Sequence, residues 1–341
     1  MKRERATIHD IAKKLDITAS TVSRALKDHP RISEATKKAV LKAAQTLNYQ
    51  PNHIAAALRN GRSKIIGIIV PTADRSFFSS VVRGIEEIAN ASKYNVMICQ
   101  SYDNYDKEVA TVEALLNARV DGIVASFAKG TDNFDHFLKV RDKGIPLILF
   151  DRSNEDLEVS NVILDDYQGA YKAVTHLINQ GCKRIAHFTG IRKISIYRER
   201  LRGYREALQD NGIPFDESLV IGSNMQLEDG IESMKKLLSL ASPPDAVFSS
   251  SDYSAMGAMQ VLKERRIRIP EDIALVGFGN EPFTWFSEPQ LTTVDQRSKE
   301  MGNAAAEIFF EQIGAGKKPF VPKKTVLKPE LIIRKSSLKK G

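Results

Sequence analysis

From residue 63 onward, short apolar runs alternate with longer amphipathic helical patterns, and this alternation is the strongest constraint on the fold. The run IIGIIV at residues 65–70 is continuously apolar, as expected for a strand buried on both faces. A helical pattern follows over residues 77–91. Such alternation favours doubly wound parallel sheets with right-handed crossovers. Further strands are predicted at residues 96–100, 123–126, 146–150, 184–189, 246–249 and 272–278, with helices between them.

The predicted strands fall into two sets of roughly three to five, so we expect two α/β lobes of doubly wound parallel sheet. Breaks in the pattern near residues 161–167 and 292–296 indicate that the chain crosses between the lobes more than once. The expected domains are a head over residues 1–50, a linking segment over 51–62 and a body over 63–341. Within the body, lobe 1 is expected at about 63–162 plus 295–322, and lobe 2 at about 163–292 plus 323–335.

The head carries three short helix patterns. Thr7 and Asp10 form a capping box at the first helix, and Thr18 and Ser33 are the N-caps of the second and third. Because so few residues separate the first two helices, the pattern predicts an all-α helix-turn-helix domain. The predicted buried residues are Ile8, Ile11, Ala12 and Leu15 in the first helix, Val22, Ala25 and Leu26 in the second, and Ala39, Val40, Ala43, Ala44 and Leu47 in the third.

The head is also strongly basic. Residues 1–64 contain 14 Lys and Arg against 5 Asp and Glu, whereas the whole chain has a formal net charge of +8. A basic head on a weakly acidic body indicates a polyanionic partner for the head alone. A solvated basic face without any ligand is the alternative.

In a helix-turn-helix, the N-terminal half of the second helix enters the major groove. The guanidinium of Arg24 can bind O6 and N7 of a guanine, and short hydroxyl side chains suit phosphates or base edges. Thr7 and the helix N-termini offer backbone N–H groups to phosphates. A protein-docking module is the alternative for a three-helix head. The predicted outward-facing residues of the second helix are Ala19, Ser20, Thr21, Ser23 and Arg24.

Residues 52–59 have the pattern of a two-turn, Ala-rich helix, which is marginally stable alone in water. We expect it to fold when the head is bound to DNA. Its small Ala residues permit close approach to a groove floor, and Leu58 is an apolar wedge of the kind that unstacks a base step. Alternatively, Leu58 packs the head against the body.

These motifs resemble the LacI/GalR family of bacterial transcriptional regulators. The resemblance is carried by TIHDIA at residues 7–12, TVSR at 21–24 and LNYQPN at 47–52, followed by Ala55 and Leu58. It implies that the segment with Asn52, Ala55 and Leu58 is a hinge helix, which enters the minor groove at the centre of a palindromic operator. It also implies that Ala19 and Ser20 are the specificity pair, and that Arg24 is the guanine contact.

The body resembles the periplasmic sugar-binding-protein fold of the same family. A transporter's solute-binding protein would share this body, but it would carry a signal peptide and lack residues 1–60. Here the N-terminus has no apolar h-region and no 18-residue apolar run is present, so neither secretion nor a membrane span is expected. The two cysteines, Cys99 and Cys182, are far apart, which fits a reducing compartment. We expect a bacterial cytoplasmic protein that is nucleoid-associated when bound to DNA.

Ligands in open α/β sheets bind beyond the carboxyl ends of the strands, where loops supply candidate residues. Phe77 or Phe78 can stack on a ligand, and Asp151 can accept hydrogen bonds from hydroxyl groups. Arg200 lies in the stretch that supplies the family's ligand-binding arginine and can donate a planar fork. Alternatively, Phe78 belongs to the core, Asp151 only pairs with Arg152, and Arg200 only pairs with Glu199 or another surface acid. The other candidate effector-binding residues are Ser251, Asp252, Gly279 and Asn280.

The chain departs from the family pattern in this set. Ser251 precedes Asp252 where many relatives have Asn-Asp, and Gly279 stands where many have an aspartate that binds a sugar hydroxyl. Candidates to replace that carboxylate are Asn280, Glu281 and Trp285. The favoured effector is a sugar, sugar acid or sugar phosphate, with a purine-type co-repressor as the alternative.

The resemblance implies a homodimeric repressor whose affinity for double-stranded operator DNA is set by a small-molecule effector, with an activator of the same architecture as the alternative. The C-terminal residues 334–341 contain no leucine heptad, so a tetramer is not expected. No phosphate-binding loop, zinc-protease or nucleophile-elbow motif occurs, so an enzyme, a cofactor and a metal site are not expected.

Overall fold

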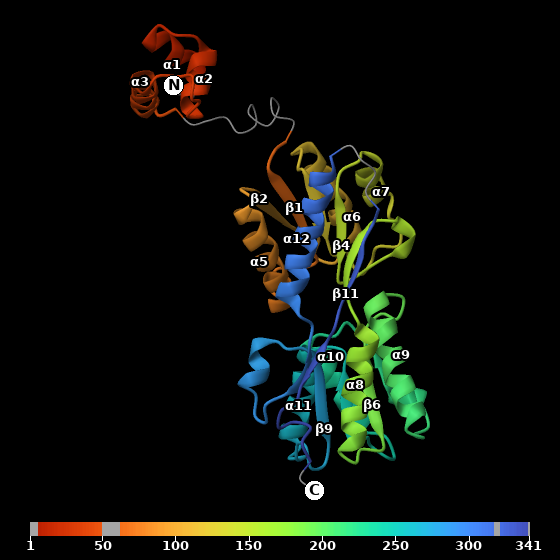
Figure 1. Ribbon diagram of the computed structural model, residues 1–341. Coiled ribbons are helices and arrows are strands. Elements are labelled where there is room, and N and C mark those ends of the chain that lie inside the picture. The colour runs from red at the N-terminus through yellow and green to blue at the C-terminus, as the bar shows by residue number, and fades with distance from the viewer. Residues whose placement is uncertain (1–5, 50–61, 317–320, 340–341) are drawn as a thin grey trace. The chain divides into compact units, whose positions relative to one another are not determined.

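The computed structural model describes residues 6–49, 62–316 and 321–339, which belong to two separate units, residues 1–63 and 64–341 (Figure 1). The predicted hinge segment, with Asn52, Ala55 and Leu58, lies outside the described residues. Each unit has a hydrophobic core of its own. Among the described residues, no helix combines the length and the apolar composition that crossing a bilayer would require.

The head consists of α1 (Ile8–Leu15), α2 (Ala19–Leu26) and α3 (Glu34–Thr46). At α1, the Asp10 carboxylate accepts hydrogen bonds from the Thr7 backbone N–H (2.7 Å) and hydroxyl (2.8 Å). The hydroxyls of Thr18 and Ser33 accept from backbone N–H groups three residues later, at 3.2 Å in both helices. All three predicted helix starts are therefore confirmed.

The core of the head contains Ile11, Val22 and Val40, which are fully buried. The prediction that Ala39 is buried was wrong, because Ala39 faces solvent and Lys37 lies on the buried face of α3. The Lys37 ammonium binds Asp28 (2.6 Å) and Glu34 (2.7 Å). Its charge thus stays paired at the surface while its aliphatic stem covers the core.

The first lobe of the body is built on a six-stranded sheet with strand order β11-β5-β4-β3-β1-β2. Its neighbouring strands are parallel. The strand β2 lies at one edge and is largely exposed, whereas β1, β3 and β4 are mostly buried. The elements are β1 (Ile65–Val70), α5 (Ser76–Ala91), β2 (Asn95–Gln100), α6 (Tyr105–Asn117), β3 (Gly122–Ala125), α7 (Asp135–Asp142), β4 (Leu147–Phe150), η1 (Glu155–Leu157), β5 (Ser160–Leu164), α12 (Ser298–Ala315) and β11 (Lys324–Leu327).

The second lobe repeats this plan with strand order β7-β6-β8-β9-β10-β12, in which only the edge strand β12 is antiparallel to its neighbour. Each sheet thus has six strands rather than three to five, because short strands such as β7 and β12 carry no clear period. The elements are α8 (Asp166–Asn179), β6 (Ile185–Thr189), α9 (Ser195–Asp210), η2 (Glu217–Leu219), β7 (Val220–Gly222), α10 (Leu227–Leu238), β8 (Ala246–Ser249), α11 (Asp252–Glu264), β9 (Ala274–Gly279), η3 (Pro282–Trp285), β10 (Thr292–Asp295) and β12 (Glu330–Ile332).

The chain passes between the two sheets three times: between β5 and α8, between β10 and α12, and between β11 and β12 (Figure 1). The expected assignment of residues 323–335 to the second lobe was therefore wrong in part, because β11 pairs with β5 of the first sheet. Within the first lobe, α12 packs closely on α5. A Cβ added to Gly302 of α12 would lie 2.1 Å from the Val81 carbonyl oxygen of α5, so this contact requires glycine.

Candidate functional site

The second helix of the head presents a continuous polar face. Ser20 and Arg24 are exposed and Ala19, Thr21 and Ser23 are half-buried, so none of the five predicted DNA contacts is buried in the core. Val22 and Ala25 point the other way, into the core. The predicted outward direction therefore holds for Ser20 and Arg24, whereas Ala19 packs partly against the core of the head, and contact with DNA stays a prediction.

Hydroxyl groups at the start of α2 are linked to one another. Thr18 Oγ1 lies 2.8 Å from Ser20 Oγ and 2.9 Å from Thr21 Oγ1. The Arg24 side chain, by contrast, has no hydrogen bond or ion pair within residues 6–49 or the rest of the described chain. The start of α2 thus offers ordered hydroxyls, and its last turn offers a guanidinium with all five donors available.

In the body, a cleft lies between the two lobes, at the carboxyl ends of the parallel strands. It encloses about 720 Å³ of empty space, a figure that includes its opening to solvent. Of the eight predicted effector-binding residues, six line this cleft: Phe77, Phe78, Asp151, Arg200, Ser251 and Gly279.

The other two predicted residues, Asp252 and Asn280, are turned away from the cleft. Asp252 is buried behind it, where its carboxylate accepts hydrogen bonds from the Thr293 hydroxyl (2.6 Å) and the Glu281 backbone N–H (2.9 Å). The Asn280 amide donates to Asp295 (2.7 Å) and accepts from Arg334 (2.8 Å). Asp252 and Asn280 therefore do not line the cleft, because position after a strand does not determine side-chain direction.

Asp151 follows β4 with φ +63°, a left-handed conformation that Asp tolerates better than most residues. Its buried carboxylate accepts one long hydrogen bond, from the Ser126 hydroxyl at 3.4 Å. Arg152 is only a distant partner, at 3.9 Å, because its guanidinium binds Asp103 at 2.6 Å. Burial raises the pKa of Asp151. This carboxylate therefore has acceptor sites to offer to a ligand.

Arg200 is held in place by several partners. Its guanidinium donates to Asp166 (2.7 Å), to the Ser250 carbonyl oxygen (2.8 Å) and to the Gln296 side chain (3.1 Å), and it lies 3.6 Å from the ring centroid of Phe278. The alternative pairing with Glu199 is not seen. Burial raises the pKa of Asp166 to about 6, and the charge of Arg200 opposes this rise.

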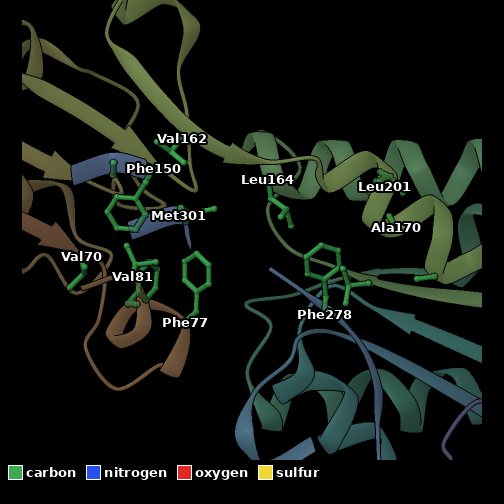
Figure 2. Packing of buried hydrophobic residues seen from close by; sticks show 14 of the residues in the cluster. Val70, Phe77, Val81, Phe150, Val162, Leu164, Ala170, Leu201, Phe278 and Met301 are labelled. Atoms are coloured by element: carbon green, nitrogen blue, oxygen red, sulfur yellow. The ribbon is translucent and has the colours of Figure 1, made fainter. Parts of the chain in front are cut away.

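Aromatic rings occupy both sides of the boundary between the lobes, with Phe77 on one side and Phe278 on the other (Figure 2). Phe77 meets Phe78 edge to face, with ring centroids 5.0 Å apart, and Phe78 in turn packs against Phe150. Phe78 is therefore both a core residue and part of the cleft wall. Such rings can stack on the apolar face of a sugar or on a base.

Sequence reasoning missed the residues that connect the lobes across the cleft mouth. From the start of α5, Arg75 donates to Gln226, and its guanidinium lies 3.4 Å from the ring centroid of Tyr253. A second contact joins the lobes, in which the Lys129 ammonium of the first lobe donates to the Asn224 carbonyl oxygen of the second (3.4 Å). The position of Arg75 just before a helix after β1 was the only available signal, since its partners are more than 150 residues away.

The conformation of the loop after β9 disfavours a side chain at Gly279, the position where many members of the family have an aspartate. Gly279 has φ +143°, a conformation that other residues rarely adopt, and a Cβ there would lie 3.1 Å from Asp252 Oδ2. Of the three candidates to replace the carboxylate, only Glu281 lines the cleft. Its carboxylate accepts a hydrogen bond from the Ser76 hydroxyl of the first lobe. Among the residues that the structure describes, no cluster of side chains suits a metal ion.

Comparison with known proteins agrees with this two-part architecture. Residues 7–52 match the family described as Bacterial regulatory proteins, lacI family, and residues 174–337 match the Periplasmic binding protein-like domain. The HTH-type transcriptional regulator DegA of Bacillus subtilis (strain 168) is 33% identical over 336 residues, which cover 98% of each chain.

Solved structures show the same fold over nearly the whole chain. The structure titled transcriptional regulator CelR-cellobiose complex has a TM-score of 0.74 at 28% identity, and covers 97% of this chain and all of its own. The lac repressor dimer bound to operator and the anti-inducer ONPF has a TM-score of 0.87 at 23% identity, and covers 98% of this chain and all of its own. The latter likeness is one of fold.

Proposed function

Because this chain belongs to the lacI family of bacterial regulatory proteins, whose members are transcriptional regulators and not enzymes, we propose that it is an operator-binding repressor controlled by a carbohydrate effector. One observation carries the proposal: the chain joins a head with exposed polar side chains on α2 to a body with a polar cleft between its two lobes.

The chemistry of the cleft supports a hydroxylated ligand of low net charge. Arg200 is paired with Asp166, while Arg152 and Lys129 share Asp103. Because these cations already have partners, a strongly anionic ligand would have to displace them. Asp151 and the aromatic ring of Phe77 can instead serve the hydroxyls and the apolar face of a sugar. The relative CelR was solved with cellobiose, which makes that disaccharide a reasonable first probe.

A homodimer is supported by apolar side chains exposed on both lobes. Met97 and Ile98 lie on the edge strand β2 of the first lobe, and Trp285 and Phe286 lie at the end of η3 in the second. Large exposed apolar groups of this kind are typical of interaction surfaces. The lac repressor, with the same fold, is a dimer on its operator. A second copy of this chain is the occupant that matches the two-fold symmetry of a palindromic site.

Effector control would act through the cleft. Ligand binding would change the arrangement of the lobes, and with it the spacing of the two linking segments over residues 51–62 in the dimer. The effector acts by its differential affinity for the two arrangements, with a coupling of about 1–3 kcal/mol.

Selection from a randomised duplex pool tests the proposal directly. The full chain should enrich an inverted repeat, sediment as a dimer, and lose or gain operator affinity when an effector from a carbohydrate panel is added. Enrichment of no inverted repeat would contradict the proposed function. Binding to DNA without any response to carbohydrates would contradict only the effector class.

A further inference from the structure

We propose that Glu281 is the residue with which the second lobe selects the effector, by accepting hydrogen bonds from hydroxyl or ammonium groups of the ligand. This inference rests on the proposed function, since it requires the cleft to hold a ligand. Glu281 lies two residues beyond Gly279, which occupies the position where many members of the family have a ligand-binding aspartate.

The backbone around Glu281 is fixed from both sides. Its N–H donates to the Asp252 carboxylate at 2.9 Å, and its carbonyl oxygen accepts from the Thr284 backbone N–H (3.0 Å) and hydroxyl (2.6 Å). The residue is only 6% exposed and lines the cleft. Its position is therefore set before any ligand arrives, as a residue that discriminates between ligands requires.

The carboxylate of Glu281 is poorly satisfied by the protein. Its hydrogen-bond partner is the neutral hydroxyl of Ser76. Within residues 6–49, 62–316 and 321–339, no Lys, Arg or His nitrogen lies within 4.0 Å of it. A carboxylate has about four acceptor sites, and a buried charge without a cationic partner is unfavourable. The remaining acceptor sites thus favour a ligand that brings donors into the cleft.

The rest of the loop cannot supply this carboxylate. A side chain at Gly279 would meet Asp252, and the Asn280 amide is committed to Asp295 and Arg334. Asp151 provides a second buried carboxylate from the first lobe. A ligand with donor groups on two of its edges could therefore bind one carboxylate from each lobe.

Three variants of the full chain separate this role from a structural one. Glu281→Gln removes the charge but keeps an oxygen that can accept from Ser76. Ser76→Ala removes the hydrogen bond from the Ser76 hydroxyl to Glu281 but keeps the carboxylate. Glu228→Gln, at an exposed position of α10, is the matched control for loss of a negative charge. The probes are cellobiose, which offers neutral hydroxyls, and glucosamine, which also offers an ammonium group. The readout is the thermal unfolding midpoint, with and without each sugar.

Without sugar, the Glu281→Gln protein should unfold at the same temperature as the wild type or higher, because an unpaired buried charge is removed. A sugar that stabilises the wild type should bind Glu281→Gln about 10- to 100-fold more weakly, whereas Ser76→Ala should lose less and Glu228→Gln nothing. A loss of affinity for cellobiose identifies hydroxyl groups as the donors, whereas a loss for glucosamine alone identifies the ammonium group.

A midpoint several degrees lower for Glu281→Gln without sugar, or unchanged sugar affinity, would overturn the proposal. If neither sugar stabilises the wild type, the unfolding midpoints of the wild type and Glu281→Gln without sugar test the proposal by themselves. The unfolding measurements without and with sugar do not use DNA. A failure of the proposed regulatory function would instead appear in the selection experiment, as no preference for any inverted repeat.

Discussion

The Nε of Arg200 donates to Oδ1 of Asp166 at 2.7 Å, at the point where the chain first passes from the first lobe to the second. The same guanidinium binds Gln296 at 3.1 Å, where the chain crosses back. Arg200 also lines the cleft. One side chain therefore contacts two of the three crossing segments and faces the candidate ligand site, which places it where ligand binding can alter the arrangement of the lobes.

Arg200→Ala is expected to abolish the change in operator affinity caused by effector while leaving operator affinity itself intact. The reason is that the variant loses the bonds to both crossing segments, whereas the head is unaffected. Fluorescence anisotropy of labelled operator with increasing effector measures both quantities. Arg202→Ala, on the exposed face of the same helix, is the control and should respond normally. A normal response in Arg200→Ala would remove this residue from the signal.

Arg24→Ala should relax base preference at one position in each half-site, at a loss of about 1–3 kcal/mol for the preferred operator. The exposed guanidinium on α2 has the geometry to read a guanine. Sequencing of duplexes selected from a randomised pool by each protein measures the change. An identical selected motif for the two proteins would argue against a base contact by Arg24.

Leu58→Ala is expected to weaken specific operator binding and to spare nonspecific binding, because a wedge in a base step acts only at the operator centre. Competition with operator and with unrelated duplex at one salt concentration measures the two affinities. Equal losses for both duplexes would be incompatible with the wedge role.

The contribution of Asp252 to the free energy of unfolding should fall as pH rises from about 4 to 7. Burial raises the pKa of Asp252 to about 7, above its ordinary value of 3.8, so the folded protein binds a proton that the unfolded chain has released. The slope from one such group is at most about 1.4 kcal/mol per pH unit. Asp252→Asn cannot titrate at this position, so the free energy of unfolding of the wild type, measured relative to that of Asp252→Asn, should fall over this range.

Urea unfolding at pH 5, 6, 7 and 8 measures this dependence. Asp272→Asn is the control, because the hydrogen bond from Arg268 lowers the pKa of exposed Asp272 to about 2, so that it does not titrate between pH 5 and 8. Wild-type and Asp252→Asn curves of the same slope would refute the assignment.

Gly302→Val should destabilise the body by about 1–3 kcal/mol or more, since its side chain would collide with the Val81 carbonyl and force α12 away from α5. Gly314→Ala, in the same helix, meets no atom within 4 Å and should be neutral or slightly stabilising. Chemical denaturation of the two variants gives the comparison. Equal stabilities would show that the helices separate at little cost.

Much of the fold was predictable because its signals are local. The caps at Thr7, Thr18 and Ser33 depend on groups three residues apart, and the strand β1 shows its burial in its own composition. The exposed face of α2 followed from helical periodicity alone. The assignment of β11 to the first sheet did not follow, since the paired residues of β5, such as Asn161 opposite Lys324, lie 163 positions earlier and no local pattern specifies that pairing.

The amino-acid sequence by itself determined the head, the order of strands and helices, and six of the residues around the cleft. The tertiary structure decided which side chains line that cleft: it left out Asp252 and Asn280, brought in Arg75 and Tyr253, and placed Glu281 there among the three candidates for the missing carboxylate. The physical reason is that a helix start or a strand end is specified by neighbours along the chain, whereas side-chain direction at the cleft depends on hydrogen bonds between residues far apart in sequence.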